Sequence, residues 1–428
     1  MYGPSRSEVA KLVLGTVTGS VIEWYAFDIT AIAASIAWPY TFFQRPDAFT
    51  GLLFSLSVYG LAFLARPLGG FVFGHFGDRY GRRATLTWTL VTMGVCTLGI
   101  GLTPSHAGEW SVALIALFTF MQGFAIGGEW GGVSTWITEY AARSRRRAFW
   151  TSWVNQGLAL GLVLATAAFS VLISTLGDAG FVAGAWRIPF YVGAAATVPA
   201  VVVRMKMVES PLFDSLQKRS QVERAPAFAV LRKMWRLVLL MVAAWFSVPA
   251  VSYVVTSFSP AYLKLSGMPA ETGPLSISIA TVALMGLILL TGLLGDRVGR
   301  RRVLLLSQAL GFVLAVPYFL LLNTGDPLLV IAGQTLFYGA TQFGLSVISA
   351  YLAEQFPGRY RYSGAGMSFQ IGALLGGGLA PVVASYLMDA FGGPKGSWIY
   401  IAGLMMAYSA VSMAATLASR ETVNRELD

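Results

Sequence analysis

The sequence is poor in charged residues and has almost no cysteine or histidine. Only 12% of its 428 residues are Asp, Glu, Lys or Arg, whereas a soluble domain carries about 25%. The single cysteine, Cys96, excludes a disulfide within the chain and any cysteine-based metal site. The two histidines, His75 and His106, lie apart and form no metal-ligand pattern. We therefore expect no metal and no cofactor.

The chain contains many long apolar runs. Hydrophobic residues make up 56% of the chain, and the mean hydropathy is +0.65. A helix needs about 20 residues to cross a hydrocarbon core of about 30 Å. Each of the following apolar segments meets that length: 12–40, 52–73, 84–103, 111–140, 149–176, 186–205, 236–262, 272–294, 303–322, 328–353, 363–390 and 397–418. The sequence predicts an all-α membrane protein with 12 transmembrane helices.

Lysine and arginine are distributed unevenly between the two sides of these segments. An even number of segments puts both termini on one side, and the loops and tails of that side, with Arg204 among them, hold 25 of the 30 basic residues. Arg66 lies within a segment, and the opposite loops hold Arg45, Arg187, Lys264 and Lys395. The positive-inside rule then predicts a multi-pass protein of the cell (inner) membrane with cytoplasmic termini. The net charge of +10 reflects this topology and indicates no nucleic-acid partner.

One ten-residue stretch occurs twice. Gly74–Arg83 reads GHFGDRYGRR, and Gly292–Arg301 reads GLLGDRVGRR. We interpret both as loops between helices. Their offset of 218 residues, about half the chain, predicts two six-helix halves related by pseudo-two-fold symmetry.

These halves are expected at residues 1–205 and 236–428, with a cytoplasmic linker at 206–235. The linker is the longest polar stretch of the chain. Ser210 and Pro211 predict a short helix inside it, because serine caps helix starts and proline is tolerated in the first turn.

Two six-helix halves with this repeat resemble the major facilitator superfamily, whose signature lies between helices 2 and 3 and between helices 8 and 9. The motifs GSVIEWYAF, FLARPLGGFVFGHFGDRYGRR, GFAIGGEWGG, WRIPF and ESPLF resemble the metabolite:proton symporter family more narrowly. That family includes carriers of oxoglutarate, citrate, shikimate and proline or betaine. It usually has Asp directly after the EWY-type triplet, whereas this chain has Ala26 there and carries Asp28.

Few ionisable residues lie at mid-depth in the predicted segments, and all of them fall in the first half. They are Glu23, Asp28, Arg66 and Glu129. Because a charge inside a membrane is costly, each is a functional hypothesis. We predict that these four couple transport to protons, and that Glu23, Arg66 and Glu129 form an acid–arginine–acid cluster in one layer. The structural alternative is that they only pair with one another or brace the helices.

Aromatic and amide side chains within the segments are candidates for solute contact. Aromatic rings attract a quaternary ammonium by cation–π interaction, although such residues more often pack helices or lie at the membrane interface. Besides Arg66, the predicted substrate-binding residues are Trp24, Tyr25, Gln122, Trp130, Asn155, Gln156, Tyr253, Gln342 and Gln370.

The repeated stretches carry no catalytic chemistry, and we predict a gating role for them. Asp78 and Asp296 are expected to cap the next helix or to pair with arginines such as Arg143 or Arg359. The predicted gate residues are Asp78, Arg79, Arg82, Glu139, Arg143, Asp296, Arg297, Arg300, Glu354 and Arg359.

The sequence thus predicts a transporter rather than an enzyme, since it has no GxSxG motif, Walker loop or metal-ligand set. Its expected partners are a small-molecule substrate, protons and the lipid bilayer, and we expect a monomer. We expect uptake of a small carboxylate or zwitterion by alternating access, because one mid-membrane arginine cannot balance a tricarboxylate. The alternatives are a proton-coupled antiporter that exports a lipophilic or cationic compound, and a transporter-like solute sensor.

Overall fold

The computed structural model describes residues 6–43, 48–105, 108–142, 144–219, 221–269 and 272–427. Within these ranges the regular structure is helical and contains no strand. Twelve helical stretches of the described chain are long and apolar enough to cross a membrane. The predicted all-α membrane fold is therefore confirmed.

The chain forms two compact units. Unit 1 comprises Met1–Tyr140, Gln156–Phe228 and Gly358–Gly366. Unit 2 comprises Ala141–Asn155, Ala229–Pro357 and Met367–Asp428. The predicted boundaries of the two halves and the linker stay predictions.

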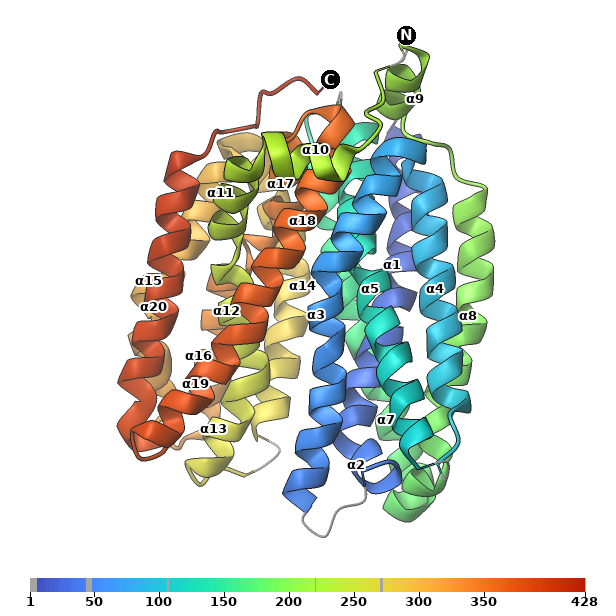
Figure 1. The fold of residues 1–428 in the computed structure, drawn as a ribbon. Coiled ribbons are helices and arrows are strands. Elements are labelled where there is room, and N and C mark those ends of the chain that lie inside the picture. Colours follow the sequence, from blue (N-terminus) through green and yellow to red (C-terminus); the bar gives the residue numbers. More distant parts are fainter. Residues whose placement is uncertain are drawn as a thin grey trace. The chain divides into compact units, whose positions relative to one another are not determined.

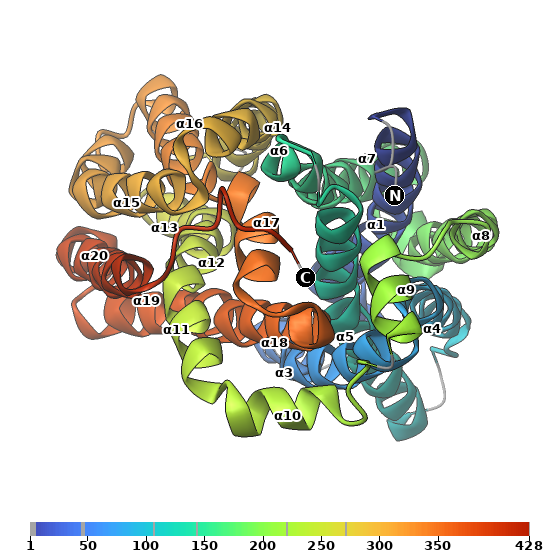
Figure 2. The same cartoon turned by 90° about the horizontal axis from the view of Figure 1, so that it is seen from above.

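The helices of unit 1 run along one another, as Figures 1 and 2 show for α3, α4, α5 and α8. The starts of α1 and α4 and the ends of α3, α5 and α8 lie at the same end of the unit (Figure 1). The elements belonging wholly or mostly to unit 1 are α1 (Arg6–Ile36), α2 (Trp38–Thr41), α3 (Ala48–Tyr80), α4 (Arg82–Leu102), α5 (Glu109–Tyr140), α7 (Val154–Ala183), η1 (Ala185–Arg187), α8 (Ile188–Met205), α9 (Pro211–Lys218) and η3 (Gly358–Tyr360).

Unit 2 repeats this plan with α14, α15, α16 and α20 packed side by side. Its elements are α6 (Arg147–Ser152), α10 (Pro226–Lys233), α11 (Trp235–Trp245), α12 (Ser247–Tyr253), η2 (Val254–Phe258), α13 (Ser259–Leu265), α14 (Thr272–Val298), α15 (Arg300–Leu322), α16 (Pro327–Gln342), α17 (Leu345–Gln355), η4 (Leu374–Gly378), α19 (Leu379–Ala390) and α20 (Pro394–Ala418). Three elements cross the unit boundaries: α7 begins in unit 2, α10 begins in unit 1, and α18 (Arg361–Ala373) leaves unit 1 after Gly366.

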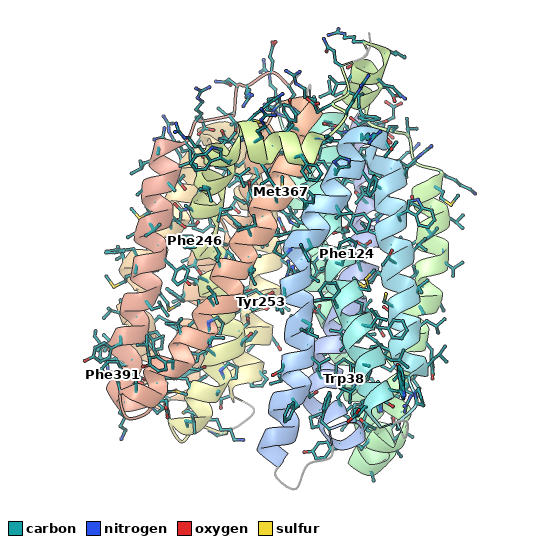
Figure 3. All side chains as sticks on the ribbon, viewed as in Figure 1. Trp38, Phe124, Phe246, Tyr253, Met367 and Phe391 are labelled. Carbon is teal, nitrogen blue, oxygen red and sulfur yellow. The ribbon has the colours of Figure 1, made fainter. Side chains whose placement is uncertain are left out.

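Glycines bring the helices of unit 1 into close contact. A Cβ atom on Gly127 of α5 would lie 2.2 Å from the carbonyl oxygen of Arg66 on α3, and one on Gly123 would lie 2.1 Å from that of Ala62. Glycine at these positions allows the two backbones to touch, as small residues do in other membrane helix pairs. Figure 3 shows Phe124 midway along unit 1 and Trp38 near the end opposite the α3–α4 junction.

The repeated ten-residue stretches are not loops, which corrects the sequence interpretation. Helix α3 continues to Tyr80, and α4 begins at Arg82, so Gly81 alone separates them. Gly81 has φ +112°, and its counterpart Gly299 has φ +108°. Only glycine adopts such a conformation readily, so one residue is enough to reverse the chain while both helices extend beyond the apolar region.

The polar stretch 206–235 contains two short helices. The hydroxyl of Ser210 accepts a hydrogen bond of 3.3 Å from the N–H of Phe213, and α9 begins at Pro211. This confirms the predicted capped helix. A second helix, α10, was not expected from the sequence, and Figure 1 shows it running across the direction of α11.

Candidate functional site

The buried charges of unit 1 meet at one arginine. On α8, Arg204 places its Nη1 atom 3.2 Å from Oε1 of Glu23 on α1. Its Nη2 atom lies 3.6 Å from Oε1 of Glu129 on α5. The three side chains are at most 1% exposed. We call Glu23, Glu129 and Arg204 the charged triad.

Neighbouring polar groups position the triad without balancing its charge. The hydroxyl of Ser20 donates a 2.5 Å hydrogen bond to Oε1 of Glu129, and that of Thr89 donates one of 3.3 Å to Oε1 of Glu23. The Oε2 atoms of both acids are buried and have no hydrogen-bond partner among the described residues. Two carboxylates and one guanidinium would carry a net negative charge, and a single bound proton would neutralise the cluster.

The arginine of this cluster differs from the one that the sequence predicts. Arg66 was expected beside Glu23 and Glu129, but Arg204 makes both ion pairs. Arg204 was counted among the loop residues because it is the second-to-last residue of α8. Side chains of a helix point toward its N-terminus, so a long side chain at this end reaches back into the bundle.

Arg66 lies instead among aromatic rings. Its guanidinium carbon is 5.7 Å from the ring centre of Trp24, 6.0 Å from that of Phe27 and 5.5 Å from that of Phe63. These distances suit cation–π attraction. Arg66 is 3% exposed, and the rings come from both α1 and α3.

Asp28 is the acid of α1 that stays outside the triad. It is half-buried, and its Oδ2 atom is buried without a hydrogen-bond partner in the described chain. It follows Phe27 directly and lies one helical turn after Trp24. Residues four apart share a helix face, so Asp28 belongs to the same side of α1 as Trp24.

Several other residues predicted to contact the solute are buried in unit 1. Gln122 is fully buried, and its amide accepts from Thr30 at 2.8 Å and donates to Thr97 at 2.9 Å. The hydroxyl of Tyr25 donates to the carbonyl of Pro189 at 3.2 Å. The polar atoms of Gln122 and Tyr25 thus have partners within unit 1. The predicted Trp130 and Gln156 are also buried, at 2% and 4% exposure.

Two of the residues predicted to contact the solute also have hydrogen-bond partners within unit 2. Asn155 donates to the carbonyl of Leu345 at 2.8 Å, and Gln342 donates to that of Val248 at 3.1 Å. Gln370 is fully buried. Tyr253 is half-buried and lies midway along the unit (Figure 3), immediately before the π-helical η2.

A network of buried ion pairs joins the helix ends of unit 1. Arg82 lies 3.3 Å from Asp78 and 2.8 Å from Glu139, and Glu139 also pairs with Arg361 at 3.0 Å. Asp78 accepts hydrogen bonds from the backbone N–H groups of Tyr362 and of the residue after it. It therefore caps α18, not the helix that follows it in sequence.

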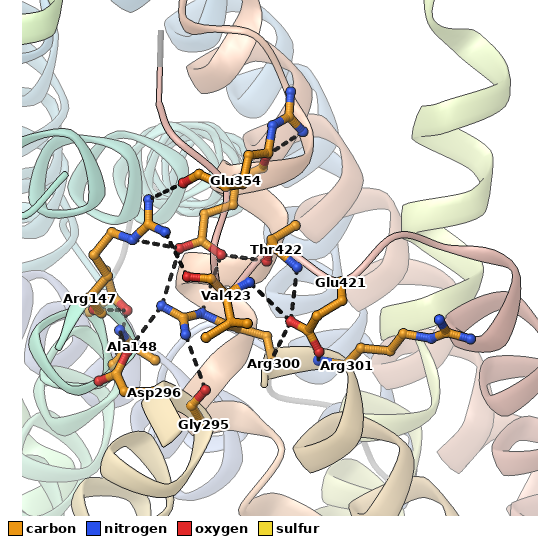
Figure 4. A network of polar contacts seen from close by, with 12 residues as sticks. Arg147, Ala148, Gly295, Asp296, Arg300, Arg301, Glu354, Glu421, Thr422 and Val423 are labelled. Atoms are coloured by element: carbon orange, nitrogen blue, oxygen red, sulfur yellow. Dashed lines mark hydrogen bonds and ion pairs between the residues drawn. The ribbon is translucent and has the colours of Figure 1, made fainter. Parts of the chain in front are cut away.

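Unit 2 contains the matching network (Figure 4). Arg300 lies 3.0 Å from Asp296 and 3.3 Å from Glu354, and Arg147 lies 3.2 Å from Glu354. Asp296 accepts from the N–H groups of Ala148 and the following residue, at 2.9 Å each. Asp296 thus caps α6, again a helix distant in sequence.

Each network also includes a glutamate that the sequence analysis missed. Glu209 accepts from the N–H groups of Arg82 and Arg83, at 3.1 Å each. Glu421 accepts from those of Arg300 and Arg301, at 3.0 and 3.1 Å. These acids cap α4 and α15 at their electropositive starts.

A sequence signal for these two glutamates was present. A hydroxyl residue follows each of them, as Ser210 and Thr422, and these donate 2.5 Å hydrogen bonds to Glu139 and Glu354. The Glu-Ser and Glu-Thr pairs recur at an offset of 212 residues, close to that of the longer repeat.

Three predicted gate arginines lie outside both networks. Arg79, Arg297 and Arg359 are exposed, and Arg79 and Arg359 lie over the rings of the tyrosines next to them. Arg143 falls outside the described residues. Besides Arg82 and Arg300, the arginines that pair with the buried glutamates are Arg361 and Arg147. Each is the first residue of a helix, α18 or α6, whose start is capped by an aspartate of its network.

Comparison with known families gives a match along the chain. The family model described as Major Facilitator Superfamily matches residues 17–339 and 282–427. This agrees with the predicted superfamily resemblance.

Similar curated proteins align over nearly the whole length. The inner membrane metabolite transport protein YhjE of Escherichia coli (strain K12) is 34% identical, with 100% of this chain and 97% of that protein covered. The shikimate transporter of the same strain is 32% identical, with 98% and 96% covered. Its proline/betaine transporter is 31% identical, with 98% and 85% covered.

Solved structures share the fold at low sequence identity. The proton:xylose symporter XylE bound to 6-bromo-6-deoxy-D-glucose gives a TM-score of 0.75 at 15% identity, with 96% of this chain and 95% of that chain covered. A partially occluded inward open form of XylE from E. coli gives 0.69 at 15% identity, with 98% and 100% covered.

Proposed function

Because the chain belongs to the major facilitator superfamily, we propose that it is a proton-coupled importer of a small polar organic solute that works by alternating access. The charged triad is the observation that carries this proposal. In each network at the helix ends the ion pairs join two acids to two arginines, and the third acid is held by backbone N–H groups at a helix start. The triad, by contrast, has two acids for one arginine. An uncompensated charge in a membrane interior is costly. We therefore propose that the triad binds one proton, which neutralises its excess negative charge.

We attribute proton coupling to the competition of Glu23 and Glu129 for the guanidinium of Arg204. In the described conformation Glu23 and Glu129 share the guanidinium of Arg204. A movement of α8 that lengthens one ion pair leaves that acid buried without a partner, which favours its neutral form. A proton then binds in one conformation and leaves in the other. This difference between the two states is what coupling requires.

The solute is proposed to be a carboxylate or a zwitterion. Arg66 supplies a buried cation beside Trp24, which suits a carboxylate end. A single such cation fits one negative group better than three. The most similar relatives reported above include carriers named for shikimate and for proline and betaine, which are solutes of this size.

The two networks are proposed to act as latches for alternating access. In unit 1, Asp78, Glu139 and Arg82 join the ends of α3 and α5 to the starts of α4 and α18. Unit 2 has the equivalent set around Glu354. Any movement that separates these helix ends must break several buried ion pairs together, so the latch has two discrete states.

We also propose how the protein is oriented in the membrane and which oligomeric state it adopts. The concentration of basic residues in the loops on the terminus side supports cytoplasmic termini in the inner membrane. Nothing in the proposed site needs a second copy of the chain, so we propose a functional monomer.

Uptake into proteoliposomes tests the function. Purified protein is reconstituted, an inward proton gradient is imposed, and accumulation of radiolabelled carboxylates, amino acids and betaines is measured with and without a protonophore. We expect accumulation above equilibrium for at least one solute and its loss with the protonophore. Outward pumping would favour the exporter alternative, and binding without movement across the membrane would favour the sensor.

A further inference from the structure

Tyr362, in the first turn of α18, is held at both of its ends within unit 1. Its backbone N–H donates a hydrogen bond of 3.1 Å to Oδ1 of Asp78. Its hydroxyl donates one of 2.8 Å to the carbonyl oxygen of Gly128 on α5. Asp78 belongs to the latch of unit 1, whereas Gly128 directly precedes Glu129 of the charged triad. Tyr362 thus bonds to the latch and to the backbone beside the proposed proton site.

Glycines on two helices leave room for the ring of Tyr362. A Cβ atom on Gly77 of α3 would overlap Cδ1 of this ring, and one on Gly132 of α5 would overlap its hydroxyl group. The ring therefore packs directly against the backbones of α3 and α5, and it is fully buried. Because a close-packed interior transmits small displacements, a shift of α5 against α3 must also displace the ring or break its bond to Gly128.

The charges around Tyr362 connect the same two places. The phenol group is influenced electrostatically by the triad and by the aspartate of the latch, which come from α1, α5, α8 and α3: Glu23, Glu129, Arg204 and Asp78. The ion pair between Glu129 and Arg204 also ties α5 to α8. A proton on Glu129 weakens that tie and changes the field at the phenol. Both effects act on the bond between Tyr362 and Gly128.

We propose that Tyr362 is a positioning residue that transmits the proton occupancy of the charged triad to the latch of unit 1. While Glu129 is charged and paired with Arg204, Gly128 holds the phenol in place and the start of α18 stays on Asp78. When Glu129 is neutral, α5 is released from α8, and the phenol bond and the cap of α18 loosen together. Binding of a proton then changes which conformation is favoured, and opening of the latch changes proton affinity in return. This inference rests on the proposed proton-coupled function and names a residue through which it acts.

Hydrogen–deuterium exchange of the purified full-length chain in nanodiscs tests the proposal without any solute. Wild type, Glu129→Gln, Tyr362→Phe and the double variant are compared at one fixed pH, because Asp78 and Glu139 of the latch can themselves titrate. Glu129→Gln imitates the proton-bound acid. The readout is the exchange rate of the amides at residues 361–366, where α18 begins. We expect Glu129→Gln to speed this exchange about fivefold or more in the wild-type background, and by less than about twofold in the Tyr362→Phe background.

The matched control is Tyr360→Phe. It removes a phenol two residues earlier, which donates to Oε2 of Glu223 at 2.9 Å and makes no bond to α5 in the described chain. This variant should keep the full response to Glu129→Gln. Folding of each variant is checked by its thermal midpoint and size-exclusion profile.

Two results would overturn the proposal. If Tyr362 only stabilised the fold, Tyr362→Phe would speed exchange by the same factor with and without Glu129→Gln, so additive effects contradict transmission. An unchanged exchange rate in Glu129→Gln alone would show that the triad does not act on the latch. Proton-driven uptake into proteoliposomes is measured separately, so the transport function can stand when this inference fails.

Discussion

The guanidinium of Arg204 pairs with the carboxylate of Glu23 at 3.2 Å, although 181 residues separate them in the chain. Both side chains are buried. Because Glu129 shares the same guanidinium, the pair is the centre of a buried cluster in unit 1 with two acids and one arginine. The proposed coupling of solute movement to protons depends on this relationship.

Replacement of Glu129 by glutamine should uncouple transport from the proton gradient. Glutamine retains an oxygen that can accept from Ser20, but it cannot be protonated and deprotonated. We expect proton-driven accumulation to be lost while solute counterflow exchange remains. Both are measured in proteoliposomes, with Glu109→Gln as a matched change on the same helix. Undiminished accumulation would remove Glu129 from the coupling role.

Replacement of Arg204 by alanine should destabilise the fold. The change leaves Glu23 and Glu129 buried without their cation, and breaking a buried ion pair in this way costs about 3–5 kcal/mol. We expect a lower thermal midpoint in detergent and partial recovery in Arg204→Lys. The double variant Arg204→Ala/Glu23→Gln should also recover part of the loss, because the two effects are coupled. An unchanged midpoint in Arg204→Ala would contradict a stabilising role for the ion pairs of the triad.

Replacement of Arg66 by alanine should weaken solute binding. If Arg66 pairs with the carboxylate of the solute, its loss removes a charge-assisted hydrogen bond worth about 1.5–3 kcal/mol, which corresponds to about a 10- to 100-fold lower affinity. Calorimetry on the purified protein measures the change, and Arg66→Lys keeps the charge as a control. Equal affinities for wild type and Arg66→Ala would assign Arg66 a structural role among its aromatic neighbours.

Replacement of Glu354 by glutamine should alter the rate of transport more than the affinity. Glu354 holds Arg147 and Arg300, and its neutralisation leaves two buried guanidinium groups with less negative charge. The latch of unit 2 is then weakened, while the proposed solute site in unit 1 is untouched. Initial rates of exchange and calorimetric affinity separate the two effects. The nearby exposed Arg297→Gln is the control, and a wild-type exchange rate in Glu354→Gln would argue against a latch.

Apolar run lengths and the repeated motif were sufficient to predict the architecture. Twelve segments with the length of a membrane span can form only helices in a bilayer, since each backbone N–H and C=O must be satisfied within its own segment. The superfamily was identified from the same motifs. Glu23 and Glu129 were recognised because a charge within an apolar run is conspicuous.

The arginine that pairs with Glu23 and Glu129 could be identified only from the tertiary structure. Arg204 stands at the end of α8 beside other polar residues, where the pattern indicates a loop. Only the packing of α8 against α1 shows that its side chain reaches inward. In the same way, Glu209 and Glu421 look like ordinary loop acids until the helix starts that they cap are seen. Hydropathy reports where a chain enters and leaves the membrane, but the direction of a long side chain at that border depends on the neighbouring helices.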